Sequence, residues 1–127
     1  MQKLRLLTRR LARAGEKPHY AGMSDRQELT GRQRRHLRAL AQRLKPVVWS
    51  GKHGVTPELL STVDQALEAH ELIKVKFVEH KERRQELTSA IAAGTDAAVA
   101  GVIGNMAILY RRQPDPEKRS IRLPGER

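Results

Sequence analysis

Residues 46–58 pass from a short apolar run, through a turn bounded by two glycines, into a strongly marked helix start. Pro46 ends any helix before it, and the run Val47–Trp49 is predicted to be a short buried strand. Thr56 is a good side-chain cap for the next helix, which Pro57 and an acid beside the positive end of its dipole also favour. A strand joined by a glycine-flanked turn to a capped helix is typical of α/β folds.

A first helix is predicted over residues 31–44. Thr30 and Gln33 have the spacing of a capping box, in which each side chain bonds the backbone N–H of the other residue. Apolar residues recur at intervals of three and four and form the expected buried stripe: Leu37, Leu40, Ala41 and Leu44. Basic residues are expected to project from the other faces of this helix, among them Arg32, Arg35 and Arg38.

The remaining patterns predict a helix to about residue 70, a strand over 72–78, a helix over 81–93 that stops at Gly94, and strands over 97–103 and 106–112. In the strand over 72–78, Lys74 and Lys76 alternate with apolar residues, so the second face of this strand is expected to lie outside the core. Gly104-Asn105 suits a tight hairpin that needs positive φ angles. The predicted fold class is α/β: a single compact domain of order α-β-α-β-α-β-β, with a mixed four-stranded sheet packed with helices.

The length of 127 residues allows one domain with short extensions. Residues 1–28 are predicted to be a flexible basic arm, residues 29–124 the folded domain, and residues 125–127 a tail. Three interpretations of the arm stay open: a nucleic-acid tail, an Arg-rich organelle transit peptide, or an extension upstream of a true start at Met23. The lack of serine before Ser24 weakens the transit-peptide interpretation.

The charge balance favours a polyanionic partner. The chain has 25 Lys and Arg residues against 14 Asp and Glu residues, a formal net charge of +11. Nucleic acid is the first candidate and an anionic membrane surface the second. No apolar run approaches the roughly 18 residues of a membrane span, so a soluble, cytoplasmic protein is expected. The absence of cysteine excludes disulfides, thiolate zinc sites and a thiol nucleophile.

The glycine-flanked turn is Gly51, Lys52, His53 and Gly54. Unpaired N–H groups at a helix start attract anions, and glycines let a phosphate approach the backbone closely. Lys52 adds positive charge and His53 a hydrogen-bonding ring. Because a Gly-x-x-Gly sequence alone is more often a plain turn, the surrounding basic residues decide the interpretation: Arg32, Arg35, Arg38, Lys45, Lys74 and Lys76.

Four sequence segments carry a family resemblance: LTGRQRRHLRALAQRLKPVVWSGKHGVT, DQALEAHELIKVK, VIGNMAILYRR and the later IRLP. Together they resemble the bacterial YhbY-like proteins and the plant CRM (chloroplast RNA splicing and ribosome maturation) domains. The resemblance implies a CRM-type RNA-binding domain over residues 29–124, with a fold similar to the C-terminal domain of translation initiation factor three. It also implies that the Gly-x-x-Gly loop contacts RNA, as in KH domains. Many relatives carry lysine where this chain has Asn105, so no phosphate contact is expected there.

The resemblance further implies a role with precursors of the large ribosomal subunit, whereas plant members assist group II intron splicing. We therefore expect a monomeric RNA-binding protein of ribosome biogenesis, with precursor ribosomal RNA as partner and with no cofactor, metal or catalytic residue. Four aromatic residues are too few to read RNA mainly by stacking, so phosphate contacts should dominate. The alternatives are an intron-splicing or general RNA-chaperone factor, and a DNA or membrane-surface binder.

An RNA-processing enzyme is the alternative from another class of function. Its candidate residues are His36, His53, His70 and His80, with Asp64 or Glu79. Their spacing matches no recognised catalytic set. The glycine turn also lacks the Gly-Lys-Ser/Thr ending of an ATP-binding P-loop, since Val55 follows Gly54.

Overall fold

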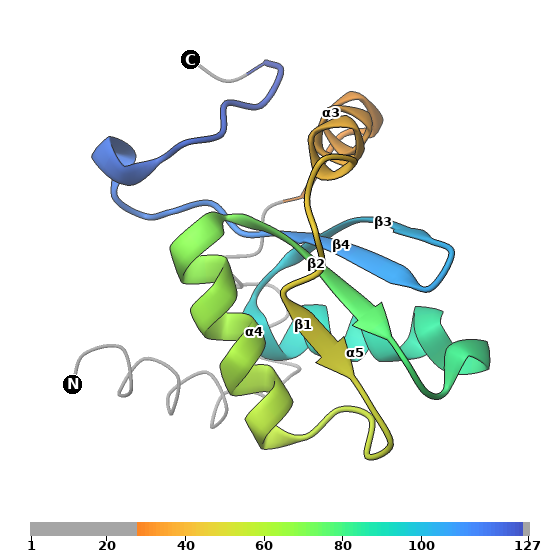
Figure 1. Ribbon diagram of the computed structural model, residues 1–127. Helices are drawn as coiled ribbons and strands as arrows, with labels where there is room; N and C mark the ends of the chain where they lie inside the picture. Colours follow the sequence, from red (N-terminus) through yellow and green to blue (C-terminus); the bar gives the residue numbers. More distant parts are fainter. Residues whose placement is uncertain (1–27, 126–127) are drawn as a thin grey trace.

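The computed structural model describes residues 28–125 (Figure 1). In chain order its elements are α3 (Gly31–Ala41), β1 (Val48–Ser50), α4 (Pro57–His70), β2 (Leu72–Phe77), the 3-10 helix η1 (Lys81–Arg83), α5 (Arg84–Thr95), β3 (Ala98–Ile103), β4 (Met106–Tyr110) and the 3-10 helix η2 (Pro116–Lys118). The predicted α/β class and the order α-β-α-β-α-β-β are confirmed. The predicted basic arm lies outside the described residues, apart from Glu28.

The sheet is mixed and four-stranded, as predicted, with the strand order β1-β2-β4-β3. β1 pairs with β2 in parallel through the crossover helix α4, and the β2–β4 and β3–β4 pairs are antiparallel. The hairpin between β3 and β4 turns at Gly104, which has a φ of +59°. Asn105 does not share that left-handed conformation, and its carbonyl accepts a hydrogen bond from the Phe77 N–H at 2.8 Å.

Each face of the sheet carries its own core. Helices α4 and α5 cover one face, and α3 covers part of the other (Figure 1). The larger core contains Val48, Val63, Leu67, Ile73, Val75, Phe77, Leu87, Ile91, Ala92, Ala97, Ala107 and Leu109. The smaller core contains Leu37, Ala41, Leu72, Ala100, Ile108, Tyr110 and Leu123. The expectation that the second face of β2 lies outside the core is therefore wrong at Leu72, which α3 covers.

The capping box at the start of α3 is confirmed in both directions. The Thr30 N–H donates to Gln33 Oε1 at 3.0 Å, and the Gln33 N–H donates to Thr30 Oγ1 at 3.0 Å. The helix ends at Ala41, three residues before the predicted end, because the residue before Pro46 disfavours helical backbone and the chain must reach β1. Leu40 and Leu44 are consequently exposed instead of completing the buried stripe.

The prediction that Gly94 stops the third helix is wrong. Helix α5 continues to Thr95, and Asp96 then takes the left-handed conformation with a φ of 56°. A Cβ atom on Gly94 would lie 3.0 Å from Leu60 Cδ2 on α4. This glycine therefore allows α4 and α5 to pack closely.

The segment after β4 returns to α3 and completes the smaller core. Leu123 is buried there, and the Gln33 side-chain amide donates to the Pro124 carbonyl at 3.0 Å. The buried carboxylate of Glu71 accepts hydrogen bonds from the Ser120 N–H at 2.6 Å and from the Gln113 N–H at 3.2 Å. These contacts hold residues 113–124 against the domain.

Candidate nucleic-acid interface

The Gly51–Gly54 loop joins β1 to α4 and faces solvent. Gly51, Lys52 and His53 are exposed, and the Gly54 N–H closes the turn by donating to the Gly51 carbonyl at 3.1 Å. Gly54 has a φ of +66°, which side-chain-bearing residues rarely adopt. A Cβ atom on Gly51 or Gly54 would meet nothing within 4 Å, so the space around the loop is open to a ligand.

His80 holds the backbone of this loop from the start of η1. Its Nε2 atom lies 2.7 Å from the Lys52 carbonyl, to which it can donate a hydrogen bond. His80 itself takes the left-handed conformation, with a φ of 58°. Sequence reasoning considered His80 only as a catalytic candidate, because nothing in the local pattern reveals a contact across 28 positions of the chain.

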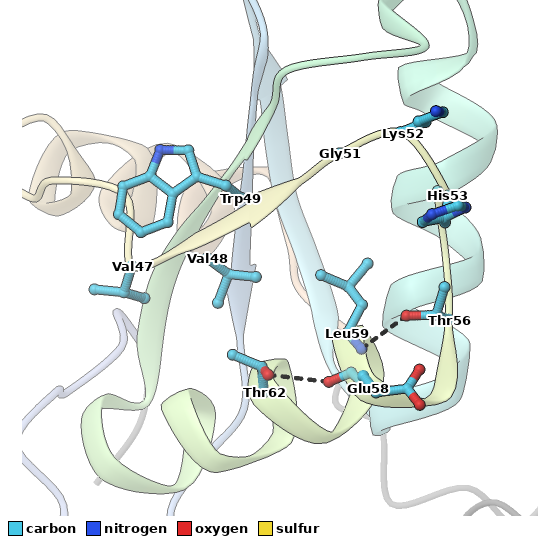
Figure 2. Close-up of a pocket in the computed structure, with 11 residues that line it drawn as sticks. Val47, Val48, Trp49, Gly51, Lys52, His53, Thr56, Glu58, Leu59 and Thr62 are labelled. Carbon is cyan, nitrogen blue, oxygen red and sulfur yellow. Dashed lines mark hydrogen bonds between the residues drawn. The ribbon is translucent and has the colours of Figure 1, made fainter.

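The start of α4 contributes less to anion binding than the sequence suggested. Pro57 has no N–H group, and Thr56 already caps the helix by accepting the Leu59 N–H at 3.0 Å on its Oγ1 atom (Figure 2). The carboxylate of Glu58 also lies in the first turn, where it partly neutralises the positive end of the helix dipole. Attraction of a phosphate to this region therefore depends mainly on the loop itself.

An open groove of about 540 Å³ lies beside the loop. It is lined by β1 with the preceding Val47, by the loop, and by the first two turns of α4 (Figure 2). Among the strands of residues 28–125, β1 lies at the edge of the sheet and pairs with β2 alone. The groove thus lies between the outer edge of this strand and a glycine-flanked basic turn.

The predicted basic residues fall into two groups on the surface. Lys74 and Lys76 lie on β2, next to β1, and on the face of the sheet that α3 only partly covers. Lys45 is exposed in the segment that leads into β1. The three arginines belong to α3, which packs on β3, β2 and β4, whereas the loop follows β1 at the opposite edge of the sheet from β3. The structure therefore does not gather the arginines of α3 around the loop.

Arg38 has a structural role that the sequence did not reveal. It is half-buried, and its Nη1 atom donates to the Ala100 carbonyl on β3 at 3.0 Å. A Cβ atom on Gly101 would lie 2.7 Å from Arg38 Cδ, so this glycine gives the arginine room against the strand. By contrast, Arg32 and Arg35 are exposed, as expected.

The electrostatic character of the region follows from a long stretch without acids. Residues 29–57 contain seven Lys and Arg residues and no Asp or Glu. The side chains of Lys52 and His53 make no ion pair with another residue of the described range. Lys52 and His53 are therefore available to an external anion.

Of the residues considered for catalysis, His53 belongs to the loop and His80 contacts the loop backbone, whereas Asp64, His36 and His70 have other places in the fold. Asp64 is 1% exposed and accepts a hydrogen bond from Arg111 Nη1 at 2.6 Å, so it belongs to a buried ion pair. His36 lies on α3, and His70 ends α4. Within residues 28–125, no three His, Cys, Asp or Glu side chains are grouped as metal ligands would be.

None of the helices in residues 28–125 is both long enough and apolar enough to cross a membrane.

The sequence pattern of the CRS1 / YhbY (CRM) domain matches residues 29–111, which include β1, the loop and all four strands. The chain belongs to this family. The "Probable RNA-binding protein YqeI" of Bacillus subtilis (strain 168) is 36% identical over 97 residues, which cover 76% of this chain and 99% of that protein. An "RNA-binding protein" of Haemophilus influenzae is 39% identical over 97 residues, with 76% and 95% covered.

A solved structure agrees with this assignment. The solution structure of SAV1595 from Staphylococcus aureus superposes on the CRM domain with a TM-score of 0.68 at 34% sequence identity. The match covers 76% of this chain and 100% of that protein. The family resemblance seen in the sequence is thus confirmed.

Proposed function

We propose that this CRM-domain protein binds structured RNA and that the Gly51–Gly54 loop contacts the phosphate backbone. The observation that carries the proposal is the exposed loop itself, which presents a lysine and a histidine beside an open groove. Two of its relatives are named as RNA-binding proteins, which supports RNA as the polyanion. The loop lies within the residues that define the family match.

The chemistry of the loop suits a phosphate. Lys52 supplies a mobile cation, and His53 supplies a ring N–H that can donate to a phosphate oxygen. His80 fixes the Lys52 carbonyl, so the turn is held in place before RNA arrives and little conformational entropy is lost on binding. Lys45, Lys74 and Lys76 add positive charge beside β1 and on β2, and Arg32 and Arg35 form a second, separate group of exposed cations on α3.

The finer proposal is a role in ribosome biogenesis, in which the cytoplasmic, monomeric protein binds precursor ribosomal RNA of the large subunit. Its support is the family resemblance together with the small size of the domain and the strength of its positive charge. Crosslinking in cells, followed by sequencing of the attached RNA, tests this choice. Recovery of large-subunit precursor RNA is the expected result, whereas recovery of introns or of unrelated RNA would favour the splicing or chaperone alternative.

Binding without catalysis is the second part of the proposal. Asp64 forms a buried ion pair with Arg111. His36 on α3 and His70 on α4 lie on separate elements from the loop. Incubation of the purified protein with labelled ribosomal RNA, with and without magnesium, should leave the RNA intact. Cleavage that depends on the amount of protein and disappears in a His53→Ala variant would contradict this part.

A competition experiment tests the choice of polyanion. A labelled, folded fragment of ribosomal RNA is bound at physiological salt, and unlabelled RNA or duplex DNA of equal length is added. The RNA should compete more strongly, because a folded RNA offers a groove geometry and 2′-hydroxyl groups that duplex DNA lacks. Equal competition would show that charge alone drives binding and would remove the support for an RNA-specific role.

A further inference from the structure

Trp49 is the only tryptophan of the chain, and it is 56% exposed on β1. The other aromatic residues of the described range, Phe77 and Tyr110, are buried in the two cores. A large aromatic side chain that stays in water forgoes the burial that would stabilise the fold. The surroundings of Trp49 therefore need to be considered as a contact surface.

Strand register places Trp49 in a row that crosses the whole sheet. Trp49 lies opposite Lys76, Lys76 opposite Met106, and Met106 opposite Ile103. Directly paired residues point to the same face of a sheet, so these four side chains share the face that α3 partly covers. Val48 points to the opposite face, into the larger core, and Figure 2 shows its side chain on the other side of β1 from the indole.

Helix α3 leaves this row uncovered. Its buried residues pack at the other end of the face, over Leu72, Ile108 and Tyr110. Val47 lies two residues before Trp49 and closer to that end. It donates its N–H to the Lys74 carbonyl at 3.2 Å and is exposed. Ile103, at the far end of the row, is 56% exposed. We call this surface the Trp49 platform, which consists of Val47, Trp49, Lys74, Lys76, Ile103 and Met106.

The charge of the platform favours a nucleotide over a protein partner. None of the four strands contains an Asp or Glu residue, and the platform carries two lysines beside its apolar side chains. A purely apolar protein surface would leave these lysines without counterions. A nucleotide satisfies both components, because its base can stack on the indole while its phosphate faces a lysine.

The platform and the loop belong to one continuous surface. Trp49 and Lys52 both line the groove beside β1 (Figure 2). Three residues of extended chain span at most about 10 Å, so the indole and the loop are within reach of neighbouring nucleotides on one strand. A strand whose phosphate rests on the loop can therefore place a base on Trp49.

We propose that Trp49 stacks on an unpaired base of the RNA strand whose phosphates the Gly51–Gly54 loop holds. The inference rests on the proposed RNA binding and adds a preference to it: the bound RNA includes a single-stranded segment. Bases within a continuous duplex are already stacked on each other and cannot lie on the indole.

The test uses the full-length protein and two probes: a single-stranded oligoadenylate and a blunt RNA duplex of the same number of nucleotides. Trp49 fluorescence reports stacking directly, because no other tryptophan contributes. The single strand should quench this fluorescence, whereas the duplex should not. Trp49→Ala should weaken single-strand binding about tenfold and change duplex binding less than twofold, while Trp49→Phe should retain most of the affinity.

Two outcomes would overturn the stacking role. One is single-strand affinity within twofold of wild type in Trp49→Ala, combined with unquenched fluorescence in the wild-type protein. The other is fluorescence that already reports burial without RNA and depends on protein concentration, which would assign the platform to a second copy of the chain. The fluorescence measurements need no variant, so they stay decisive even if Trp49→Ala folds poorly.

Failure of this inference differs from failure of the proposed function. A protein that binds neither probe, nor folded ribosomal RNA, contradicts RNA binding as a whole. A protein that binds RNA, loses affinity when Lys52 and His53 are replaced by Asp, and ignores the Trp49 substitution contradicts only the stacking role. Leu40→Ala is the matched control, because Leu40 is another exposed apolar residue and lies on α3, outside the platform.

Discussion

The Gly51–Gly54 loop and the Asp64–Arg111 pair use basic residues in opposite ways. Lys52 is exposed and makes no ion pair within the described part of the chain. Arg111 has a side chain 12% exposed, and it donates to Asp64 Oδ1, to the Asp64 carbonyl and to the Thr95 carbonyl. Arg111 thereby ties the end of β4 to α4 and α5, whereas Lys52 remains available to a ligand.

The number of basic residues is therefore larger than the number of cations that can contact RNA. Arg38 and Arg111 both serve the fold through hydrogen bonds to backbone carbonyls. Lys76 lies on an uncovered part of the sheet and is exposed. Burial and available partners, more than charge, decide which cation stabilises the domain and which one meets a phosphate.

The largest effect is expected from Asp64→Ala. The substitution removes the Asp64 carboxylate from the buried Arg111 guanidinium, which should lower the free energy of unfolding by about 3–5 kcal/mol. Thermal and urea unfolding measure the loss. RNA affinity of the protein that remains folded should not change, because the pair lies apart from the loop.

The Arg83–Glu86 pair provides the matched control for this substitution. Its nitrogen–oxygen distance of 2.7 Å is nearly that of the buried pair, but both side chains are exposed. The hydrogen bond from Arg83 lowers the pKa of Glu86, yet solvent screens an exposed pair. Glu86→Ala should therefore leave the unfolding midpoint nearly unchanged, and equal losses in the two variants would contradict the assigned role of burial.

A smaller effect is expected from His80→Gly, which tests the hydrogen bond that supports the loop. Glycine keeps the left-handed conformation at this position but removes the hydrogen bond to the Lys52 carbonyl. One such bond contributes about 1 kcal/mol, so RNA affinity should fall severalfold while the unfolding temperature changes little. Amide hydrogen exchange at Lys52 and His53 should become faster. Unchanged exchange together with unchanged affinity would show that His80 does not position the loop.

The smallest effect is expected from Tyr110→Phe, which should alter how stability depends on pH. Burial raises the pKa of Tyr110 above its ordinary value of 10.0. The phenol therefore ionises first in the unfolded chain, so its contribution to stability is complete below pH 10 and is lost as the pH rises further. Urea unfolding from pH 9 to pH 11 should show a steeper loss for the wild-type protein than for Tyr110→Phe. Parallel pH profiles would contradict this assignment.

Local signals explain why much of the fold could be predicted from the sequence. Thr30 with Gln33, and Thr56 with Pro57, mark helix starts through contacts within a few residues, and both caps are observed. The alternation of apolar residues along β2 likewise predicts the face that meets α4 and α5. Such patterns are visible because each depends on neighbours in the sequence.

The features that could not be predicted depend on distant parts of the chain. Periodicity shows that a face is apolar but not which helix covers it, so the smaller core at Leu72 was missed. The contacts of Arg38 with Ala100 and of His80 with Lys52 join residues 62 and 28 positions apart. At the candidate site, the loop could be identified from its glycines, whereas its support by His80 and the exposure of Trp49 required the structure.

The most direct test of the central claim compares two variants with equal changes of charge. Lys52→Asp with His53→Asp changes the loop, and Lys118→Asp with Arg122→Gln changes exposed residues of the C-terminal segment, on the opposite side of the molecule (Figure 1). Affinity for a folded ribosomal RNA fragment is measured at fixed salt, beside thermal unfolding of each variant. The loop variant should lose at least about tenfold in affinity with an unchanged unfolding temperature, while the control loses far less. Equal losses in the two variants, or full affinity in the loop variant, would contradict a specific contact between this loop and RNA.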